Sequence, residues 1–187
     1  MRIVAGALRG RPLVAPKGHS TRPTADRVRQ AVFNLLEHAP WAPAFEGARV
    51  LDLFAGSGAM GLEAISRGAA FCRFVERAED AAAAIRANVA KLGLADRTSL
   101  DRRDATRLGA RPEAQPAFDF AFVDPPYGEG LGEAAVAALA EGRWLDADSI
   151  VVLERGWRDA VGTPLGFALM DERTWGAATV SFLCPER

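Results

Sequence analysis

The sequence predicts an α/β fold with a mostly parallel sheet and helices on both of its faces. Strand-like and helix-like segments alternate from Arg49 to Glu154, which is the pattern of parallel strands joined by helical crossovers. A glycine cluster follows the first of these strands, and two strand-like segments stand in succession near the C-terminal end. The length of 187 residues, with 49% hydrophobic and 25% charged residues, fits one ordinary globular domain.

The N-terminal residues are predicted to form a short β-ribbon. Residues 2–5 and 11–15 are strand-like and are joined by a turn that contains two glycines. Such a ribbon would carry Arg9 and Arg11 outward.

A helix is predicted after this ribbon. Thr24 is a suitable N-cap, and apolar residues recur at helical spacing up to about His38. Pro40 and Pro43 would end the helix. We expect its apolar face to lie on the main body of the protein.

The remaining elements are expected to build the sheet. Predicted strands are 49–54, 71–76, 98–102, 118–124 and 149–154, and predicted helices are 59–67, 78–92 and 131–141, with a weak helical turn after Asp104. The segments 167–175 and 178–184 predict an antiparallel hairpin that completes a seven-stranded sheet. We expect a single domain over residues 1–187, divided into an N-terminal extension, 1–38, and a core, 39–187.

Neither a membrane span nor an export signal is expected. The longest stretch without a charged side chain, Thr174 to Pro185, has 12 residues, too few to cross a bilayer. Arg2 and Arg9 bracket six residues, too few for the apolar centre of a secretory signal, so a cytoplasmic protein is expected. Cys72 and Cys184 lack a paired metal-ligand spacing and are expected in the core, with no disulfide and no zinc.

The net charge of −1 conceals an uneven distribution. The first 30 residues hold seven basic side chains against Asp26 alone, whereas the other 157 residues hold 16 basic and 23 acidic ones. A basic N-terminal segment on an acidic body indicates an anionic partner held at one edge. A merely solvated basic face is the alternative.

A G-x-G-x-x-G pattern, Gly56, Gly58 and Gly61, stands between the first core strand and the following helix. This spacing allows a tight turn, lets a ligand touch the backbone and presents the amides of a helix N-terminus. Glu76 ends the next strand, where an acidic side chain can accept both hydroxyls of an adenosine ribose. These features fit a nicotinamide dinucleotide as well as S-adenosylmethionine.

Two further features favour S-adenosylmethionine. Asp52 precedes the glycines, where a carboxylate suits the amino group and sulfonium of this ligand and would repel a pyrophosphate. A later strand ends in Asp124-Pro125-Pro126-Tyr127. The prolines fix the backbone and remove two N–H donors, so this loop presents hydrogen-bond acceptors. By itself the Pro-Pro pair would equally fit a rigid strand-to-loop turn.

Acceptors are what an exocyclic amine of a nucleobase needs, because its lone pair is delocalised into the ring. The Asp124 carboxylate and the Pro125 carbonyl can hold the N–H bonds while the nitrogen pyramidalises toward the methyl group. Tyr127 can stack on a base that has been extruded from its duplex. We therefore predict a direct in-line methyl transfer that depends on positioning, with no covalent enzyme intermediate and no metal. Asp104 could bind the adenine amino group of the cofactor, although an ordinary exposed acid fits that position nearly as well.

Taken together, these motifs resemble the bacterial 16S rRNA (guanine(966)-N2)-methyltransferase family. The resemblance covers nearly the whole chain, in MRIVAGALRGRPL at 1–13, RPTADRVRQAVFNLL at 22–36, LDLFAGSGAMGLEAISRGA at 51–69, the acid Glu76, FVDPPY at 122–127 and the C-terminal hairpin. The second and third segments together are specific. The DPPY tetrapeptide alone is shared with adenine-N6 and cytosine-N4 methyltransferases of DNA.

The resemblance implies a Rossmann-like class I methyltransferase that uses S-adenosylmethionine and releases S-adenosylhomocysteine. Its implied cofactor contacts are Asp52, Phe54, Gly56, Gly58, Glu76, Arg77, Asp104 and Ala105, and its implied catalytic loop is Asp124-Pro125-Pro126-Tyr127. Arg77 follows Glu76 where a second acid would be usual, which leaves the ribose contacts open.

The resemblance also implies that residues 22–29 lie beside the catalytic loop. The predicted nucleic-acid contacts are Arg9 and Arg11 of the ribbon and Arg22, Thr24, Arg27 and Arg29, the last four of which would face RNA phosphate or the carboxylate of the cofactor. Of these, Arg27 and Arg29 could equally be helix-surface charges without a ligand. The expected partner is 16S rRNA or an assembly particle of the small ribosomal subunit, bound by a monomer.

Three alternatives remain beside this prediction. A DNA adenine-N6 or cytosine-N4 methyltransferase would use the same loop, but it usually needs a sizeable target-recognition region, for which 187 residues leave little room. A catalytically silent module could dock on rRNA without methylating it. A nicotinamide-dependent dehydrogenase would use the glycine cluster alone.

Overall fold

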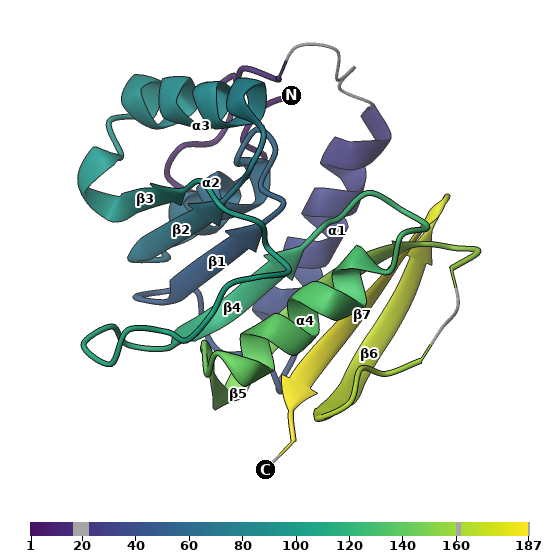
Figure 1. The fold of residues 1–187 in the computed structure, drawn as a ribbon. Coiled ribbons are helices and arrows are strands. Elements are labelled where there is room, and N and C mark those ends of the chain that lie inside the picture. Colours follow the sequence, from purple (N-terminus) through teal and green to yellow (C-terminus); the bar gives the residue numbers. More distant parts are fainter. Residues whose placement is uncertain (17–22, 160–161, 187) are drawn as a thin grey trace.

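Seven strands form one sheet that runs through the molecule, in the order β3-β2-β1-β4-β5-β7-β6 (Figure 1). The structure, a computed structural model, describes residues 1–16, 23–159 and 162–186. Strands β1 to β5 pair in parallel, and β7 runs antiparallel to both of its neighbours. This arrangement confirms the predicted fold class.

The core elements match their predicted ranges closely. The strands are β1 (Arg49–Leu53), β2 (Phe71–Val75), β3 (Thr98–Asp101), β4 (Phe118–Val123), β5 (Leu145–Gly156), β6 (Phe167–Trp175) and β7 (Ala178–Pro185). The helices are α1 (Pro23–His38), α2 (Ala59–Ser66), α3 (Glu79–Leu92) and α4 (Leu131–Glu141), with a short 3-10 helix at Ala95–Arg97. The main difference is β5, which begins earlier and ends later than predicted.

Two predictions of local structure were wrong. Thr24 lies inside α1 and not before it, because the helix begins at Pro23, a residue whose fixed φ and missing N–H suit the first helical position. After Asp104 the chain makes only a turn, closed by the Arg107 N–H on the Asp104 carbonyl at 3.0 Å. Gly109 and Pro112 follow this turn, and neither favours a helix.

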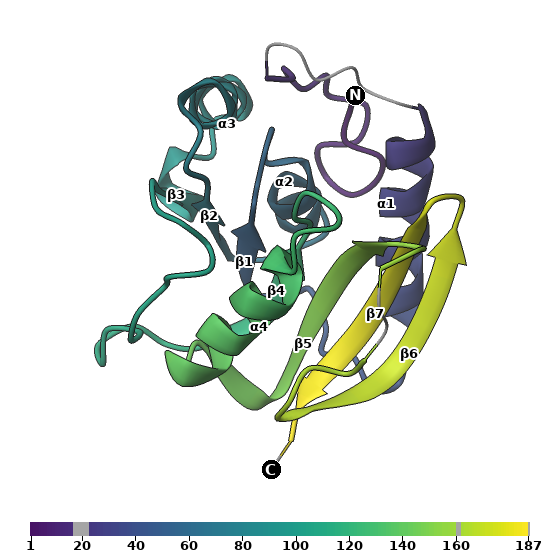
Figure 2. The same ribbon diagram turned by 45° about the vertical axis from the view of Figure 1, so that its right-hand side comes forward.

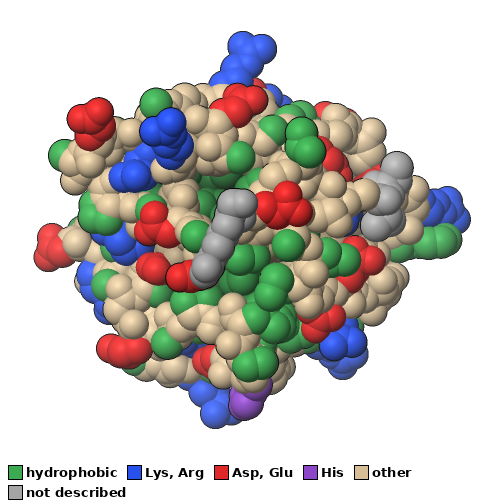
Figure 3. Space-filling model, turned by 90° about the horizontal axis from the view of Figure 1, so that it is seen from below, with side chains coloured by type: hydrophobic (Ala, Val, Ile, Leu, Met, Phe, Trp, Pro, Cys, Tyr) green, Lys and Arg blue, Asp and Glu red, His purple; other side chains and the backbone are tan. Residues whose placement is uncertain are grey.

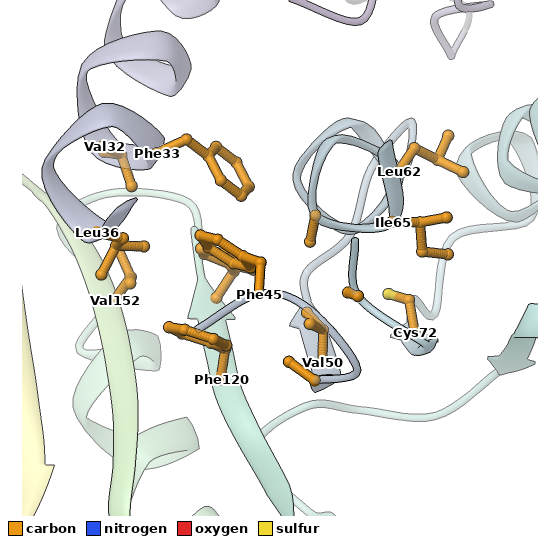
Figure 4. Close-up of a cluster of buried hydrophobic side chains, with 14 of the residues drawn as sticks. Val32, Phe33, Leu36, Phe45, Val50, Leu62, Ile65, Cys72, Phe120 and Val152 are labelled. Atoms are coloured by element: carbon orange, nitrogen blue, oxygen red, sulfur yellow. The ribbon is translucent and has the colours of Figure 1, made fainter. Parts of the chain in front are cut away.

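Two hydrophobic clusters lie on opposite faces of the sheet. Helices α1 and α2 cover one face, and α4 covers the other (Figures 1 and 2). In the first cluster, Phe33 of α1 packs against Phe45, with ring centroids 5.2 Å apart (Figure 4). Phe33 packs against Phe122 at the same centroid distance. Cys72 is buried in the same cluster, as expected, whereas Cys184 is only half-buried.

The predicted N-terminal ribbon is present but short. Arg2 and Pro12 form its one antiparallel bridge, and backbone hydrogen bonds join Ile3 to Gly10 and Arg11 at 2.8 and 3.0 Å. Other backbone groups of the same segment bond to the core. The N–H groups of Val4 and Ala5 donate to the Glu63 carboxylate at 2.7 and 3.0 Å, so they cannot pair with a second strand. Residues 1–16 therefore form an arm on the core, and we refer to them by this name below.

The end of the molecule opposite the arm carries charges of both signs. Basic and acidic side chains lie singly around this face, with apolar side chains between them, and neither sign dominates (Figure 3). No helix in the described part of the chain is long and apolar enough to span a bilayer.

Candidate active site

The carboxyl ends of β1 and β4 border the point where the strand order reverses. From β1 the chain continues outward to β2 and β3, and it then returns to place β4 on the other side of β1. Sheets of this type bind ligands at such a switch point. The structure brings the glycine-rich loop after β1 and the Asp124–Tyr127 loop after β4 to this edge.

The glycine-rich loop turns sharply between β1 and α2. Gly56 and Gly58 have φ values of 56° and 77°, in the left-handed region that glycine adopts without strain. Phe54 has a φ of 57° although it is not glycine. Such strain is concentrated at functional sites, and here it lies in the loop that the glycine pattern marked as a ligand site.

Glu76 lies directly after β2 and holds this loop in place. One carboxylate oxygen, Oε2, accepts the Gly56 N–H at 2.9 Å, and the other, Oε1, accepts the Ala78 N–H at 2.8 Å. A carboxylate oxygen has two lone pairs, so each oxygen can accept one further hydrogen bond. Glu76 can therefore support the loop and receive ribose hydroxyls at the same time.

Asp52 is a buried acid at the carboxyl end of β1. Its Oδ2 accepts the Gly61 N–H of α2 at 2.9 Å. Burial raises its pKa to about 7, an effect that the Gly61 hydrogen bond opposes and the nearby Glu76 carboxylate increases. A Cβ at Gly61 would lie 2.3 Å from the Cys72 sulfur, so α2 approaches Asp52 this closely only because residue 61 has no side chain.

Asp104 follows β3 and has the opposite pKa shift. Its Oδ1 accepts hydrogen bonds from the backbone N–H and the hydroxyl of Thr106, and these bonds lower its pKa. The exposed Arg77 lies 3.7 Å from Oδ2 and adds to this effect. Ala105 is buried beside it. Asp104 is thus an ionised acceptor on the same edge as Glu76 and Asp52.

The Asp124–Tyr127 loop leaves β4 next to β5. Pro125 is buried, and the other three residues are exposed. A Cβ at Gly132 would lie 3.3 Å from the Pro125 ring, which shows how closely the start of α4 supports the loop. The protein atoms around the Asp124 carboxyl raise its pKa well above the usual value, and the carboxylates of Glu154 and Asp52 add repulsion.

Glu154 is a site residue that the sequence analysis missed. Val123 pairs with Leu153 in the sheet, so Asp124 and Glu154 follow in register on neighbouring strands. The Tyr127 hydroxyl donates a hydrogen bond to Glu154 Oε1. The signal was present in the sequence, because Glu154 ends the predicted strand 149–154 just as Glu76 and Asp124 end theirs.

A cavity of about 520 Å³ opens beside this pair. Its wall consists of residues 125–128 and 130–133, Glu154 and Arg155, and Asp159 with 162–164. Its volume lies in the range of about 300 to 1,000 Å³ that is typical of small-molecule sites. Among the described residues, the wall includes neither Asp52 nor the glycine-rich loop, so the cavity lies on the β5 side of the Asp124–Tyr127 loop.

The predicted nucleic-acid contacts have different environments. Arg9, Arg11 and Arg27 are exposed. Arg29 is a correction, because it is buried at 5% exposure, where its Nη2 donates to the Arg2 carbonyl at 2.6 Å and to Asp26 at 3.0 Å. It therefore holds the arm and cannot face RNA.

Two predicted contacts in the same group lie where the structure gives no account of them. Arg22 lies outside the described residues, and the structure describes the backbone of Thr24 but not its side chain.

Comparison with known proteins places the chain in one family over nearly its full length. A family model described as Conserved hypothetical protein 95 matches residues 1–184. The Haemophilus influenzae protein "Ribosomal RNA small subunit methyltransferase D" is 33% identical over 177 residues, which cover 94% of this chain and 89% of that protein. The Bacillus subtilis protein "Putative rRNA methyltransferase YlbH" is 37% identical over 183 residues, 97% of each chain.

The fold comparison agrees with the sequence comparison. The solved structure "Putative methyltransferase yhhF from Escherichia coli" superposes with a TM-score of 0.81 at 32% identity, covering 100% of this chain and 98% of that one. The family match, the relatives, the strand order and the motifs at the switch point thus all indicate a methyltransferase. The chain belongs to the family described as Conserved hypothetical protein 95, the family of the ribosomal RNA small subunit methyltransferases D.

Proposed function

We propose that this protein transfers a methyl group from S-adenosylmethionine to the exocyclic N2 of a guanine in 16S rRNA and releases S-adenosylhomocysteine. One observation carries the proposal: the sheet register gathers Asp52, the glycine-rich loop, Glu76 and the Asp124–Tyr127 loop at one edge. The relatives named as small-subunit rRNA methyltransferases support rRNA as the substrate. Such a substrate would place the reaction in the cytoplasm.

The residues at this edge fit S-adenosylmethionine. Asp52 is buried and its carboxylate has only the Gly61 N–H as a hydrogen-bond donor among the described residues, so a cationic amino group nearby would stabilise its ionised form. Glu76 keeps acceptor capacity for ribose hydroxyls, and Asp104 is an ionised acceptor that can receive an amine. When bound, the cofactor supplies an electrophilic methyl group on a sulfonium.

The loop after β4 would act on the base. The Asp124 carboxylate and the Pro125 carbonyl would accept the N–H bonds of the guanine amine, which directs the nitrogen lone pair out of the ring system. The raised pKa of Asp124 makes its carboxylate a better acceptor for the proton that the amine loses. Tyr127, which is 47% exposed, offers a ring face on which an extruded base can stack.

The proposal is tested with labelled S-adenosylmethionine and 30S particles from a strain that lacks the modification. The wild-type protein should label 16S rRNA, and digestion with mass spectrometry should identify N2-methylguanosine. Asp124→Ala should lower kcat by about 100- to 1,000-fold, the usual loss when an acceptor or donor that acts in the transition state is removed. Its dissociation constant for S-adenosylmethionine should stay close to that of the wild type.

Glu129→Ala is the matched control, because Glu129 is an exposed acid of the same loop that does not line the cavity. It should keep wild-type activity. A protein that binds the cofactor but labels no rRNA would refute the proposal, and labelled DNA would favour a DNA methyltransferase. Unchanged modification by Asp124→Ala would favour a silent binding module.

A further inference from the structure

We propose that Glu154 identifies the target base as guanine by accepting a hydrogen bond from its N1–H. This inference rests on the proposed function, because it assigns a role in the same site. Guanine presents neighbouring N1–H and N2–H donors, whereas adenine presents an unprotonated N1 acceptor. A carboxylate at this position would therefore bind guanine and repel the N1 lone pair of adenine.

The sheet register places two acids where these two donors would lie. Val123 and Leu153 pair across β4 and β5, and both side chains are in the cluster under α4. Successive side chains of a strand alternate between faces, so Asp124 and Glu154 both lie toward the other face, on strands about 4.8 Å apart. If the Asp124 carboxylate accepts a hydrogen bond from the guanine N2 amine, the Glu154 carboxylate is the acceptor nearest to the neighbouring N1–H.

One oxygen of Glu154 is held and the other is available. The Tyr127 hydroxyl donates to Oε1, and within the described ranges no side chain or backbone donor reaches Oε2. No cation within 4.0 Å neutralises the carboxylate among the described residues. A half-buried carboxylate without a cation is costly for a purely structural residue, and Oε2 can accept a neutral N–H donor.

The adjacent residue, Arg155, builds the wall of the cavity instead. It is 5% exposed, and its guanidinium donates to Ser181 Oγ at 2.6 Å and to the Gly162 carbonyl at 3.1 Å. It also pairs with Glu133 at the start of α4, at 3.3 Å. These contacts tie β5 to α4 and to the chain after Asp159, so the cavity beside Glu154 is formed before a base arrives.

Tyr127 connects stacking to recognition. A Cβ at Gly156 would lie 3.3 Å from the Tyr127 ring, so the ring packs against the end of β5 because residue 156 is glycine. The ring that stacks on the base is therefore also the group that orients Glu154. This arrangement fixes the carboxylate relative to the plane of the base.

The test replaces the target guanine with 2-aminopurine, which keeps the amine at C2 but has an unprotonated N1. Mass spectrometry first locates the N2-methylguanosine, and splinted ligation then yields 16S rRNA with either base at that site. The wild-type protein should prefer guanine by about 10- to 100-fold in kcat/KM. Glu154→Gln, whose amide can donate to N1, should lose most activity on guanine and shift this preference toward 2-aminopurine by a similar factor.

A binding measurement separates recognition from catalysis. In the presence of S-adenosylhomocysteine, the fluorescence of 2-aminopurine should report tighter capture of this base by Glu154→Gln than by the wild type. Glu129→Gln, the same change at an exposed acid of the neighbouring loop, should leave both the preference and the capture unchanged. Glu154→Ala has neither a hydrogen-bond acceptor nor a donor at this position and should reduce the preference for guanine. This variant provides the test if Glu154→Gln does not fold.

An unchanged preference in Glu154→Gln would overturn the inference. An equal loss of kcat/KM on guanine and on 2-aminopurine would also overturn it, because such a loss would assign Glu154 to catalysis or to packing. If the wild-type protein forms no N2-methylguanosine at all, the proposed function fails instead, and this outcome is seen before any variant is compared.

Discussion

At the scale of residues, the acids of the site share one edge of the sheet but have different pKa shifts. Burial raises the pKa of Asp52, and the protein atoms around the Asp124 carboxyl, with the nearby Glu154 and Asp52 carboxylates, raise that of Asp124. Hydrogen bonds from Thr106 lower the pKa of Asp104. A site for a cation and an amine needs both kinds of acid. An ionised acceptor binds a neutral amine. A carboxyl group with a raised pKa can take up a proton, or it can be held ionised by a nearby positive charge.

The shift at Asp52 predicts a pH dependence of stability. Its ordinary pKa of 3.8 rises to about 7 in the folded protein, so the folded state keeps this proton between about pH 4 and pH 7 while the unfolded chain loses it. Stability therefore falls as the pH rises through this window, by on the order of 4 kcal/mol from this group. Asp52→Asn, which cannot titrate, should lack this contribution.

Urea denaturation of the two proteins without S-adenosylmethionine measures the effect. The difference in unfolding free energy between wild type and Asp52→Asn should change steeply from pH 4 to pH 7 and level off above it. Parallel pH profiles for the two proteins would contradict the assigned pKa.

At the scale of elements, the arm is attached to the core through buried polar side chains of α2 and α3. Glu63 and Ser66 of α2 accept N–H groups of Val4, Ala5 and Leu8. Asn88 of α3 bonds both the N–H and the carbonyl of Val14, and its amide also donates to the Ser57 carbonyl of the glycine-rich loop. The Asn88 side chain thus contacts both the arm and the glycine-rich loop.

Glu63→Gln should destabilise the protein by about 3 to 5 kcal/mol. The Glu63 carboxylate is fully buried, accepts two N–H groups of the arm and lies 2.9 Å from Arg67. The neutral amide would leave the buried Arg67 without this partner and offers only one oxygen to the arm. Chemical denaturation measures the loss.

Glu37→Gln is the control, because Glu37 contacts the same arginine at 2.8 Å from a side chain that is 37% exposed. Ion pairs at the surface contribute about 1 kcal/mol or less. Similar losses of unfolding free energy in the two variants would contradict this prediction. They would show that the burial of Glu63 makes its pairing with Arg67 no more stabilising than that of Glu37.

At the scale of the whole molecule, charge is divided between the N-terminal segment and the body. Seven of the first 30 residues are basic and one is acidic, while the overall net charge is −1. Arg9 and Arg11 stand exposed on the arm, and the opposite end of the molecule has mixed charges (Figure 3). A slightly acidic protein can therefore present a basic surface to RNA at one end.

RNA binding should accordingly weaken steeply with salt. Each arginine that contacts a phosphate contributes about one unit to the slope of log Kobs against log salt. The double change Arg9→Gln and Arg11→Gln should lower this slope by about 2, as measured by filter binding over a salt series. Arg143→Gln, at an exposed arginine between α4 and β5, should leave it unchanged. An unaltered slope in the double variant would remove the arm from the RNA interface.

The sequence by itself determined the fold class, a mostly parallel sheet closed by an antiparallel hairpin, and the residues that stand at the ends of its strands. Alternating strand and helix patterns are local, and a parallel sheet brings the residues that end its strands to one edge. For this reason the positions of Asp52, Glu76 and Asp124 in the chain are enough to assign them to one site. The bounds of the core elements, apart from those of β5, followed from the same local periodicity.

Only the tertiary structure decided which polar groups meet across the chain. Arg29 has the sequence surroundings of a surface arginine, but its partner is the carbonyl of Arg2, 27 residues away. The ribbon lies against α2 because Glu63, 59 residues from Val4, accepts the N–H groups of Val4 and Ala5. Glu154 joined the site only through the register of β4 with β5. Sequence patterns record local periodicity, whereas the partner of a buried polar group depends on how distant elements pack, and packing is what satisfies its hydrogen bonds.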